Sequence, residues 1–279
     1  MSKENQIRIA ILDLYDGVPN EGMRGIRQLI EEFEVDFHLI VTHEVFDVRL
    51  KTQIPDLSFD VYISSGGPGS PLDSEGSLWE RKYFSLMESI KDHNKQHPDQ
   101  KKHVLLICHS FQIFCRYYGF GLVTKRKSTS FGVMPVHKTD EGHHDSLYKS
   151  LGDPLWAVDS RDYQITQPNM EKIESTGGAL LCIEKYRPHV DLDRAVMSIR
   201  FDDAFVGMQF HPEADASGMR MYLLREDKKE LVIEKHGVNK YWEMLDHLND
   251  PDKIMLTYST IVPRFLMVAT QHRIGSVSI

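Results

Sequence analysis

A cysteine at the end of a predicted strand is the residue of this sequence best placed to do chemistry. Cys108 ends the apolar run 103–108, and a helix-like stretch begins directly after it at His109. A strand that turns sharply into a helix exposes the residue at the turn and points the first free N–H groups of the helix toward it. A thiol at such a turn feels the positive end of the helix dipole, which favours the thiolate form. Cys108 is therefore our candidate nucleophile.

Two other segments carry groups that such a nucleophile needs. The loop 66–70, Gly-Gly-Pro-Gly-Ser, follows a predicted strand, and main-chain N–H groups in a glycine-rich turn can hold an oxyanion. His211 stands at another strand end with Glu213 two residues later, so its imidazole could act as a general base oriented by the carboxylate. Taken singly, each segment is better explained as structural, and the hypothesis depends on their combination with Cys108.

The three segments together resemble the class I glutamine amidotransferase family. Residues 66–70 resemble the family's oxyanion strand, residues 107–112 its nucleophile segment, and residues 209–213 its Phe-His-Pro-Glu segment. Their order along the chain agrees, and the resemblance extends over roughly residues 7–221. Among the members of the family, the sequence is most similar to stand-alone, GMP-synthase-like proteins.

This resemblance implies a role for each matching residue. Cys108 would attack the carboxamide of glutamine, His211 would transfer the protons, and Glu213 would orient His211. A γ-glutamyl thioester would form and then be hydrolysed. No cofactor and no metal are implied. The other implied site residues are two oxyanion-hole donors, the main-chain N–H groups of Gly67 and His109, and two substrate-binding residues, Gln112 and Gly66.

The sequence also departs from the family pattern near the nucleophile. Ser110 and Phe111 replace the usual glycine and histidine, and Ser110 is expected to strain the turn. Residues 159–164 align with a substrate loop of the family, with Arg161 where histidine is common. Two alternatives therefore stand beside a glutaminase: a γ-glutamyl peptidase, and a non-catalytic binding or regulatory protein that retains the fold.

Composition limits the partners. The chain has 279 residues, a net charge of −8 and a pI near 5.9, which argues against nucleic acid and anionic membranes as partners. The polar first six residues lack a signal-peptide core, and three cysteines give no disulfide framework, so we expect a cytoplasmic protein. His143, His144 and Asp145 are expected to lie in a solvated loop rather than at a metal. Arg24 is expected to be solvated on the polar side of the first helix.

Strands and helices alternate through residue 118, which predicts an α/β protein with a doubly wound, mostly parallel, flavodoxin-like sheet flanked by helices. Shorter strands after residue 119 suggest antiparallel additions, and a helical extension follows. We divide the chain into an amidotransferase-like domain, 1–221, and a helical extension, 222–279, packed on that domain. Alternatively, the extension could cover the site or form a homodimer contact. The expected strands are 7–14, 37–41, 59–64, 103–108, 131–137, 179–184, 195–201 and 204–210, and the expected helices are 21–34, 78–93, 110–118, 218–226, 229–236, 239–248 and 252–262, with Pro263 interrupting the last.

A substrate and a second protein are the partners that the resemblance implies. The substrate would be glutamine or a γ-glutamyl compound. Residues 64–68 already belong to the oxyanion strand, and no other Ser-Gly-Gly-X-Asp-Ser phosphate loop occurs in the sequence. We therefore expect a separate synthetase to use the ammonia.

Overall fold

The computed structural model describes residues 6–189, 191–250 and 253–274. The polar N-terminal segment discussed above therefore lies almost entirely outside the described residues. The strands are β1 (Gln6–Asp13), β2 (Ile40–Asp47), β3 (Val61–Ser64), β4 (His103–Ile107), β5 (Leu122–Lys138), β6 (Leu155–Thr166), β7 (Ala179–Glu184), β8 (Val196–Arg200) and β9 (Phe205–Met208). The helices are α1 (Gly22–Phe37), α2 (Val48–Lys51), α3 (Leu78–Gln96), α4 (His109–Tyr118), α5 (Asp140–His144), α6 (Met170–Ser175), α7 (Ala216–Leu224), α8 (Glu226–His236), α9 (Val238–Leu248) and α10 (Ile254–Ile274).

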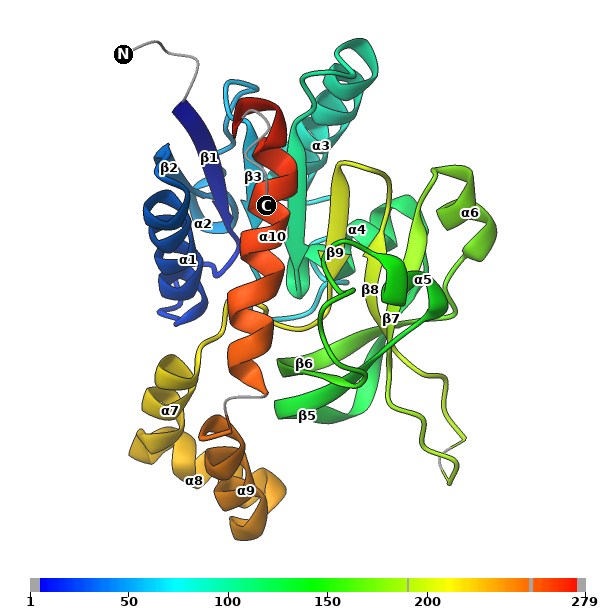
Figure 1. Ribbon diagram of the computed structural model, residues 1–279. Coiled ribbons are helices and arrows are strands. Elements are labelled where there is room, and N and C mark those ends of the chain that lie inside the picture. The colour runs from blue at the N-terminus through cyan, green and yellow to red at the C-terminus, as the bar shows by residue number, and fades with distance from the viewer. Residues whose placement is uncertain (1–5, 190, 251–252, 275–279) are drawn as a thin grey trace.

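The strands form one mixed sheet in the order β2-β1-β3-β4-β9-β8-β7-β5-β6 (Figure 1). From β2 to β9 the neighbouring strands pair in parallel, whereas from β9 to β6 they pair antiparallel. The α/β class and the antiparallel additions predicted from the sequence are thus confirmed. The parallel half places the carboxyl ends of β1, β3, β4 and β9 along one edge, which is where open α/β sheets bind ligands.

Both faces of the parallel half are buried. Along β1, Ile9 and Ile11 face a core covered by α1 and α10, whereas Ala10 and Leu12 face a second core covered by α3 and α4. Because successive side chains of a strand point to opposite faces, an unbroken apolar run is what a sheet covered on both sides requires. This arrangement fixes β4 between two packed layers, and with it the residue that follows β4.

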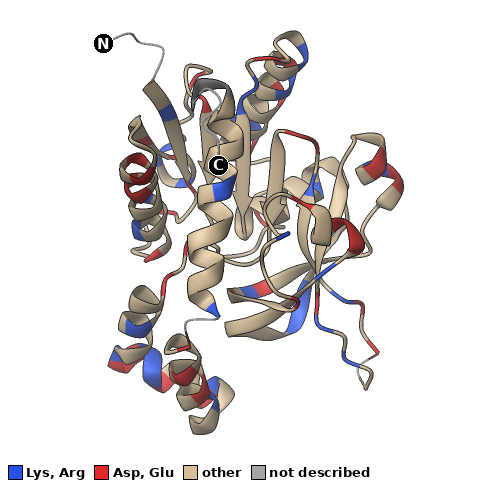
Figure 2. Ribbon diagram, viewed as in Figure 1, with Lys and Arg blue, Asp and Glu red and all other residues tan. Residues whose placement is uncertain are grey.

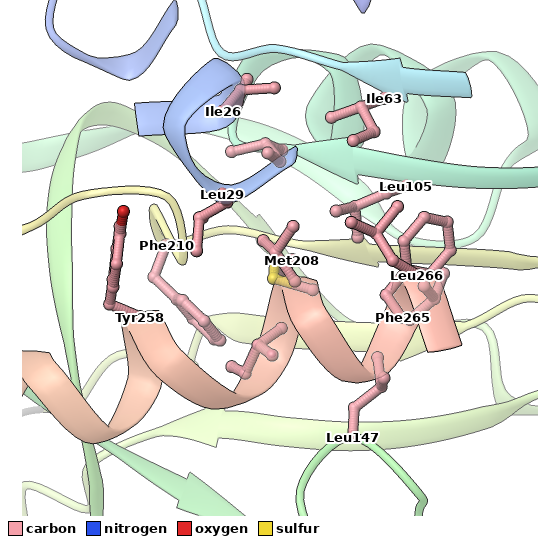
Figure 3. Packing of buried hydrophobic residues seen from close by; sticks show 14 of the residues in the cluster. Ile26, Leu29, Ile63, Leu105, Leu147, Met208, Phe210, Tyr258, Phe265 and Leu266 are labelled. Carbon is pink, nitrogen blue, oxygen red and sulfur yellow. The ribbon is translucent and has the colours of Figure 1, made fainter. Parts of the chain in front are cut away.

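Helix α10 belongs to the main core. In Figure 3, its residues Tyr258, Phe265 and Leu266 lie against Met208 and Phe210, which come from β9 and the segment after it. Figure 2 shows this helix almost free of charged side chains, in contrast to α1. Helix α10 packs between α1 and β6, and this burial explains its apolar character. No described helix is long and apolar enough to span a membrane.

The prediction that Pro263 interrupts the last helix is wrong, because α10 continues through it to Ile274. Proline inside a helix removes one main-chain hydrogen bond and costs about 3 kcal/mol. The neighbouring side chains of Ile261, Val262 and Leu266 are fully buried, and each contributes about 1.5–3 kcal/mol. Burial of this segment therefore outweighs the local penalty.

Helices α7, α8 and α9 lie together below α1 and α10, beside β5 and β6 (Figure 1), and share a small apolar cluster with these two strands. Tyr241 and Met244 of α9 pack there with Val133 of β5 and Val158 of β6. The division at residue 221 falls within α7, and the two-part description of the chain stays a prediction. The buried members of this cluster are Val133, Val158, Leu223, Val232, Tyr241, Met244, Leu245, Leu248 and Ile254.

Two further expectations are wrong, and packing explains both. The strand expected at 37–41 begins only at Ile40, because α1 continues through Phe37. The ring centroids of Phe37 and of Phe33, one turn earlier in α1, lie 4.7 Å apart. Residues 159–164, expected as a loop, lie within β6 and pair with β5. These residues are mostly polar, but their charged side chains form ion pairs inside the sheet, as described below.

Candidate active site

Strand order brings the candidate nucleophile and base together. β4 and β9 are parallel neighbours in the register Ile107 with Met208, and the N–H of Cys108 donates to the Met208 carbonyl at 2.8 Å. Cys108 directly follows β4, and His211 lies three residues after the end of β9. Both therefore leave the sheet at the same edge. The main chain of His211 is also tied to β6, since its N–H donates to the Val158 carbonyl at 2.8 Å.

Cys108 occupies a strained turn between β4 and α4. Its φ and ψ are 50° and −100°, a conformation that non-glycine residues rarely adopt. Ser110 supports this turn: its hydroxyl accepts from the Ile107 N–H at 2.8 Å and lies 2.9 Å from the Ser64 carbonyl. The expectation that Ser110 strains the turn is therefore wrong, because its side chain ties the turn to β3.

Phe111, the second departure from the family pattern, is fully buried. A methyl group on Gly207 of β9 would lie only 2.4 Å from Phe111 Cδ2. The missing side chain at Gly207 thus makes room for the larger ring. Ser110 and Phe111 are therefore both accommodated by local packing.

A chain of buried amides reaches the sulfur. Gln209 donates from Nε2 to Cys108 Sγ at 3.6 Å and accepts from Gln112 Nε2 at 3.1 Å. The thiol also lies 3.8 Å from the Ser160 carbonyl. Gln209 was not among the residues predicted from the sequence, and its donor would stabilise negative charge on sulfur. Gln112 lines the cavity at Cys108 but donates its amide to Gln209 and to the Tyr163 carbonyl.

His211 forms a nearly buried pair with Glu213. Nδ1 of His211 lies 2.8 Å from Oε1 of Glu213, and only 13% of the His211 side chain is exposed. Burial alone lowers the pKa of His211. The Glu213 carboxylate and the charge and hydrogen bond of Cys108 outweigh it, so the pKa of His211 is raised well above its usual value. The Glu213 carboxylate therefore favours the imidazolium form of His211.

The predicted oxyanion loop lies next to this pair. A methyl group on Gly67 would lie 2.3 Å from the Leu14 carbonyl, so only glycine permits this close approach. Arg49 holds the loop by donating from NH1 to the Pro68 carbonyl at 2.7 Å and to the Leu14 carbonyl at 3.2 Å. Gly67 lines the cavity at Cys108. Gly66, the first residue of this loop, lies against His211, as discussed below.

His109 follows Cys108 directly at the start of α4. Its ring is buried, and burial lowers the pKa of His109 to about 3, with the nearby Arg49 and Arg116 acting in the same direction. The ring is therefore neutral at physiological pH. The main-chain N–H of His109 begins α4 directly after Cys108, which is the position that an oxyanion donor requires.

Tyr15 is a site residue that the sequence analysis missed. A methyl group on Gly22 would lie 2.4 Å from the Tyr15 hydroxyl and 3.0 Å from Glu213 Oε1. Burial, followed by the charges of Glu213 and Cys108, raises the pKa of Tyr15 well above its usual value. Tyrosine after β1 gives no signal in a sequence. The glycine at position 22, at the start of an amphipathic helix, was the available hint that something lies close by.

Arg161 lies in a buried charge network. Its side chain is 1% exposed, and its Nε lies 2.9 Å from both carboxylate oxygens of Asp159. Glu184 and Arg126 continue the network, with Arg126 NH2 3.0 Å from Glu184 Oε1. These pairs explain how a polar stretch forms a buried strand. Arg161 also reaches the cavity at Cys108.

Arg24 is partly solvated, with 37% of its side chain exposed, but it is also paired. It donates from NH2 to both oxygens of Asp215, at 2.8 and 2.9 Å. Asp215 in turn caps the start of α7 through the Gly218 N–H. This pair fixes the chain that leads from Glu213 into α7.

A cavity of about 850 Å³ opens at Cys108. Cys115 and Cys182 are buried elsewhere, and burial raises the pKa of both thiols well above the usual value. Neither is therefore suited to act as a nucleophile. Within residues 6–274 as described, no group of three or more His, Cys, Asp or Glu side chains could hold a metal ion. His143 and His144 are exposed, but the loop expected at 143–145 is wrong, because both residues end the short helix α5 and Asp145 pairs with Arg200.

Comparison with known proteins agrees with this architecture. The family described as glutamine amidotransferase class-I matches residues 11–230. A glutamine amidotransferase from Thermotoga maritima has a similar structure, with a TM-score of 0.68 and 15% identity over 95% of this chain and 98% of that one. One from Methylobacillus flagellatus gives a TM-score of 0.64 and 15% identity over 96% and 95%. The glutaminase domain of Trypanosoma brucei CTPS, solved with bound acivicin, gives 0.59 and 12% over 95% and 94%. No curated protein matches the sequence.

The structure is that of an α/β protein in which Cys108 stands at a strand-to-helix turn, at the carboxyl edge of the parallel strands. The family match covers most of the chain, so the protein belongs to the class I glutamine amidotransferase family. The resemblance stated from the sequence is thereby confirmed at the level of the family and the fold.

Proposed function

We propose that this protein hydrolyses the carboxamide of glutamine to glutamate and ammonia through a thioester on Cys108. Support comes from one observation above all: the side chains of Cys108 and His211 face the same point above Gly66. A methyl group there would lie 3.5 Å from Cys108 Cβ and 2.9 Å from His211 Cε1. Nucleophile, base and orienting carboxylate are then available together.

In the first half of the reaction, the thiolate of Cys108 attacks the carboxamide carbon and forms the carbon–sulfur bond. The carbonyl electron pair moves to oxygen, where the N–H groups of Gly67 and His109 stabilise it. The tetrahedral intermediate collapses and the carbon–nitrogen bond breaks. The imidazolium of His211 gives its proton to the departing nitrogen, so that ammonia leaves.

In the second half, water attacks the thioester. His211, now neutral, accepts a proton from the water, and the carbon–sulfur bond breaks to release glutamate and restore the thiolate. Glu213 holds the ring through Nδ1, which leaves Nε2 for proton transfer. Gln209, whose amide donates to the sulfur, stabilises the thiolate at the beginning and end of the cycle.

We further propose that the ammonia released when glutamine is the substrate serves a separate acceptor enzyme, in keeping with the family to which the chain belongs. A GMP-synthase-like pathway stays a prediction from the sequence resemblance. The acceptor would dock where the cavity at Cys108 opens to solvent.

Release of glutamate from glutamine tests the proposal. We expect Cys108→Ala to lower the rate by about 10⁴-fold or more, as loss of a member of a catalytic triad does. Cys182→Ala, which removes a buried thiol elsewhere, is the matched control and should retain activity. Equal rates for wild type and Cys108→Ala would refute the proposal. Glutamine binding by calorimetry with no turnover would instead indicate a non-catalytic binding protein.

A further inference from the structure

The cavity at Cys108 is larger than free glutamine needs. Its volume of about 850 Å³ lies in the upper part of the range of roughly 300–1,000 Å³ found for drug-sized ligands. A single amino acid is much smaller than such ligands. The cavity therefore has room for a group attached to the glutamyl part of a substrate.

The additional space has a distinct wall, which we call the α7 compartment. It is formed by Phe131 of β5, Met219 and Tyr222 of α7, and Arg225 and Lys228 beyond α7. The rings of Phe131 and Tyr222 lie 5.7 Å apart, and the ammonium of Lys228 lies 5.5 Å from the centre of the Tyr222 ring. The compartment thus combines an aromatic and thioether surface with positive charge at its outer end.

That outer charge is only partly balanced. Arg225 pairs with Asp227 at 2.9 Å, and Lys228 lies 3.7 Å from the same carboxylate. Two cations thus share one anion there, while charges of both signs alternate along α8 (Figure 2). A carboxylate on a bound molecule would meet net positive charge at this end of the compartment.

Chemistry places the compartment on the leaving-group side of Cys108. A departing amine must lie against His211, because that ring supplies its proton. The chain runs from His211 and Glu213 directly into α7, and Ala214, Asp215 and Met219 line the same cavity. The pair between Asp215 and Arg24 fixes this segment in place. A group attached to the departing nitrogen would therefore enter the α7 compartment.

We infer that the α7 compartment is a leaving-group subsite, and that the preferred substrate is a γ-glutamyl amide of an amine that carries an aromatic body and a carboxylate. This inference rests on the proposed function, because the nucleophile and the thioester are the same. The amide carbon–nitrogen bond breaks, His211 protonates the nitrogen, and the free amine leaves in place of ammonia. Water then hydrolyses the thioester to glutamate.

The probes are glutamine, γ-glutamylglycine and γ-glutamylphenylalanine, which share the glutamyl part and differ in the leaving amine. We expect kcat/KM for γ-glutamylphenylalanine to exceed the values for the other two by about tenfold or more, as burial of an aromatic side chain predicts. Tyr222→Ala should lower the ratio of kcat/KM for γ-glutamylphenylalanine to kcat/KM for glutamine. Tyr222→Phe, which keeps the aromatic ring, should retain the wild-type ratio. Trp242→Ala, an aromatic residue of α9 that is 57% exposed and does not line the cavity, is the control.

Failure of the α7 compartment as a subsite can be distinguished from failure of Cys108-dependent hydrolysis. If Cys108-dependent glutamine hydrolysis occurs but γ-glutamylphenylalanine is no better than γ-glutamylglycine, the subsite is refuted and the function stands. If none of the three probes is hydrolysed, both are refuted. Binding of γ-glutamylphenylalanine to Cys108→Ala, measured by calorimetry, checks the subsite without turnover. Affinity equal to that of γ-glutamylglycine would contradict it.

Discussion

A methyl group added at Gly66 should uncouple the base from the nucleophile without unfolding the protein. In Gly66→Ala the new Cβ would lie 2.9 Å from His211 Cε1, 3.3 Å from the Tyr15 hydroxyl and 3.5 Å from Cys108 Cβ. The main chain at Gly66 does not have a positive φ, so alanine causes no backbone strain there. The effect of the substitution therefore comes from these contacts alone.

The size of the effect follows from the overlap. Non-bonded carbon atoms rest about 3.5–4.0 Å apart, so the ring of His211 must move by about half an ångström to one ångström. A misplacement of about 1 Å at a reacting group can cost on the order of 100-fold in rate. We therefore expect kcat/KM for glutamine to fall by roughly 10- to 100-fold. Overpacking should cost about 1–3 kcal/mol of stability, and each kcal/mol lowers Tm by about 2–4 °C in a chain of this size.

The assay compares glutamate release and thermal melting for the same preparations. Gly152→Ala is the control, because its Cβ would meet nothing closer than the Pro154 carbonyl at 3.6 Å, and we expect wild-type activity and melting. A folded Gly66→Ala protein with kcat/KM within twofold of wild type would refute the arrangement of His211 and Cys108 over Gly66.

Three other substitutions test separate parts of the account. Glu213→Gln removes a charge that raises the pKa of His211; the imidazolium is then lost at lower pH, so the alkaline limb of the kcat/KM profile should move to lower pH. A limb that stays in place would argue against the pair. Ser110→Ala leaves the buried Ile107 N–H without its partner and should lower the free energy of unfolding by about 1–3 kcal/mol; urea denaturation with no change would contradict this. Arg161→Met leaves Asp159 buried and unpaired and should cost about 3–5 kcal/mol in the same assay, whereas a loss below about 1 kcal/mol would argue against the network.

Most of the parallel half of the fold could be predicted from the sequence. Its central strands β3, β4 and β9 are buried on both faces, so each one is a short apolar run, and helices with clear periodicity lie between the strands in the sequence. The antiparallel half was harder to predict, because residues 124–130 of β5 and 159–164 of β6 are mostly polar. Arg161 and Asp159 neutralise each other inside the sheet, and no pattern of hydrophobicity reveals such a pair. Pro263 was also misread, because the burial of its neighbours in α10 outweighs the tendency of proline to end a helix.

The candidate site was predictable where chemistry leaves a local signature. Cys108 stands at a strand-to-helix boundary and His211 at a strand end, and the structure brings both to one edge because β4 and β9 are neighbours. Gln209 and Tyr15 were missed, since their positions depend on how distant segments pack. The roles of Gly67, His109 and Gln112 in catalysis stay predictions.

The central claim is that Cys108 carries a γ-glutamyl thioester during turnover. Acid quenching within milliseconds of mixing protein with glutamine, followed by digestion and mass spectrometry, measures this directly. We predict the added mass of a glutamyl group on the peptide that contains Cys108, and none on the peptides that contain Cys115 or Cys182. Glutamate release with no such mass on Cys108 would contradict the account.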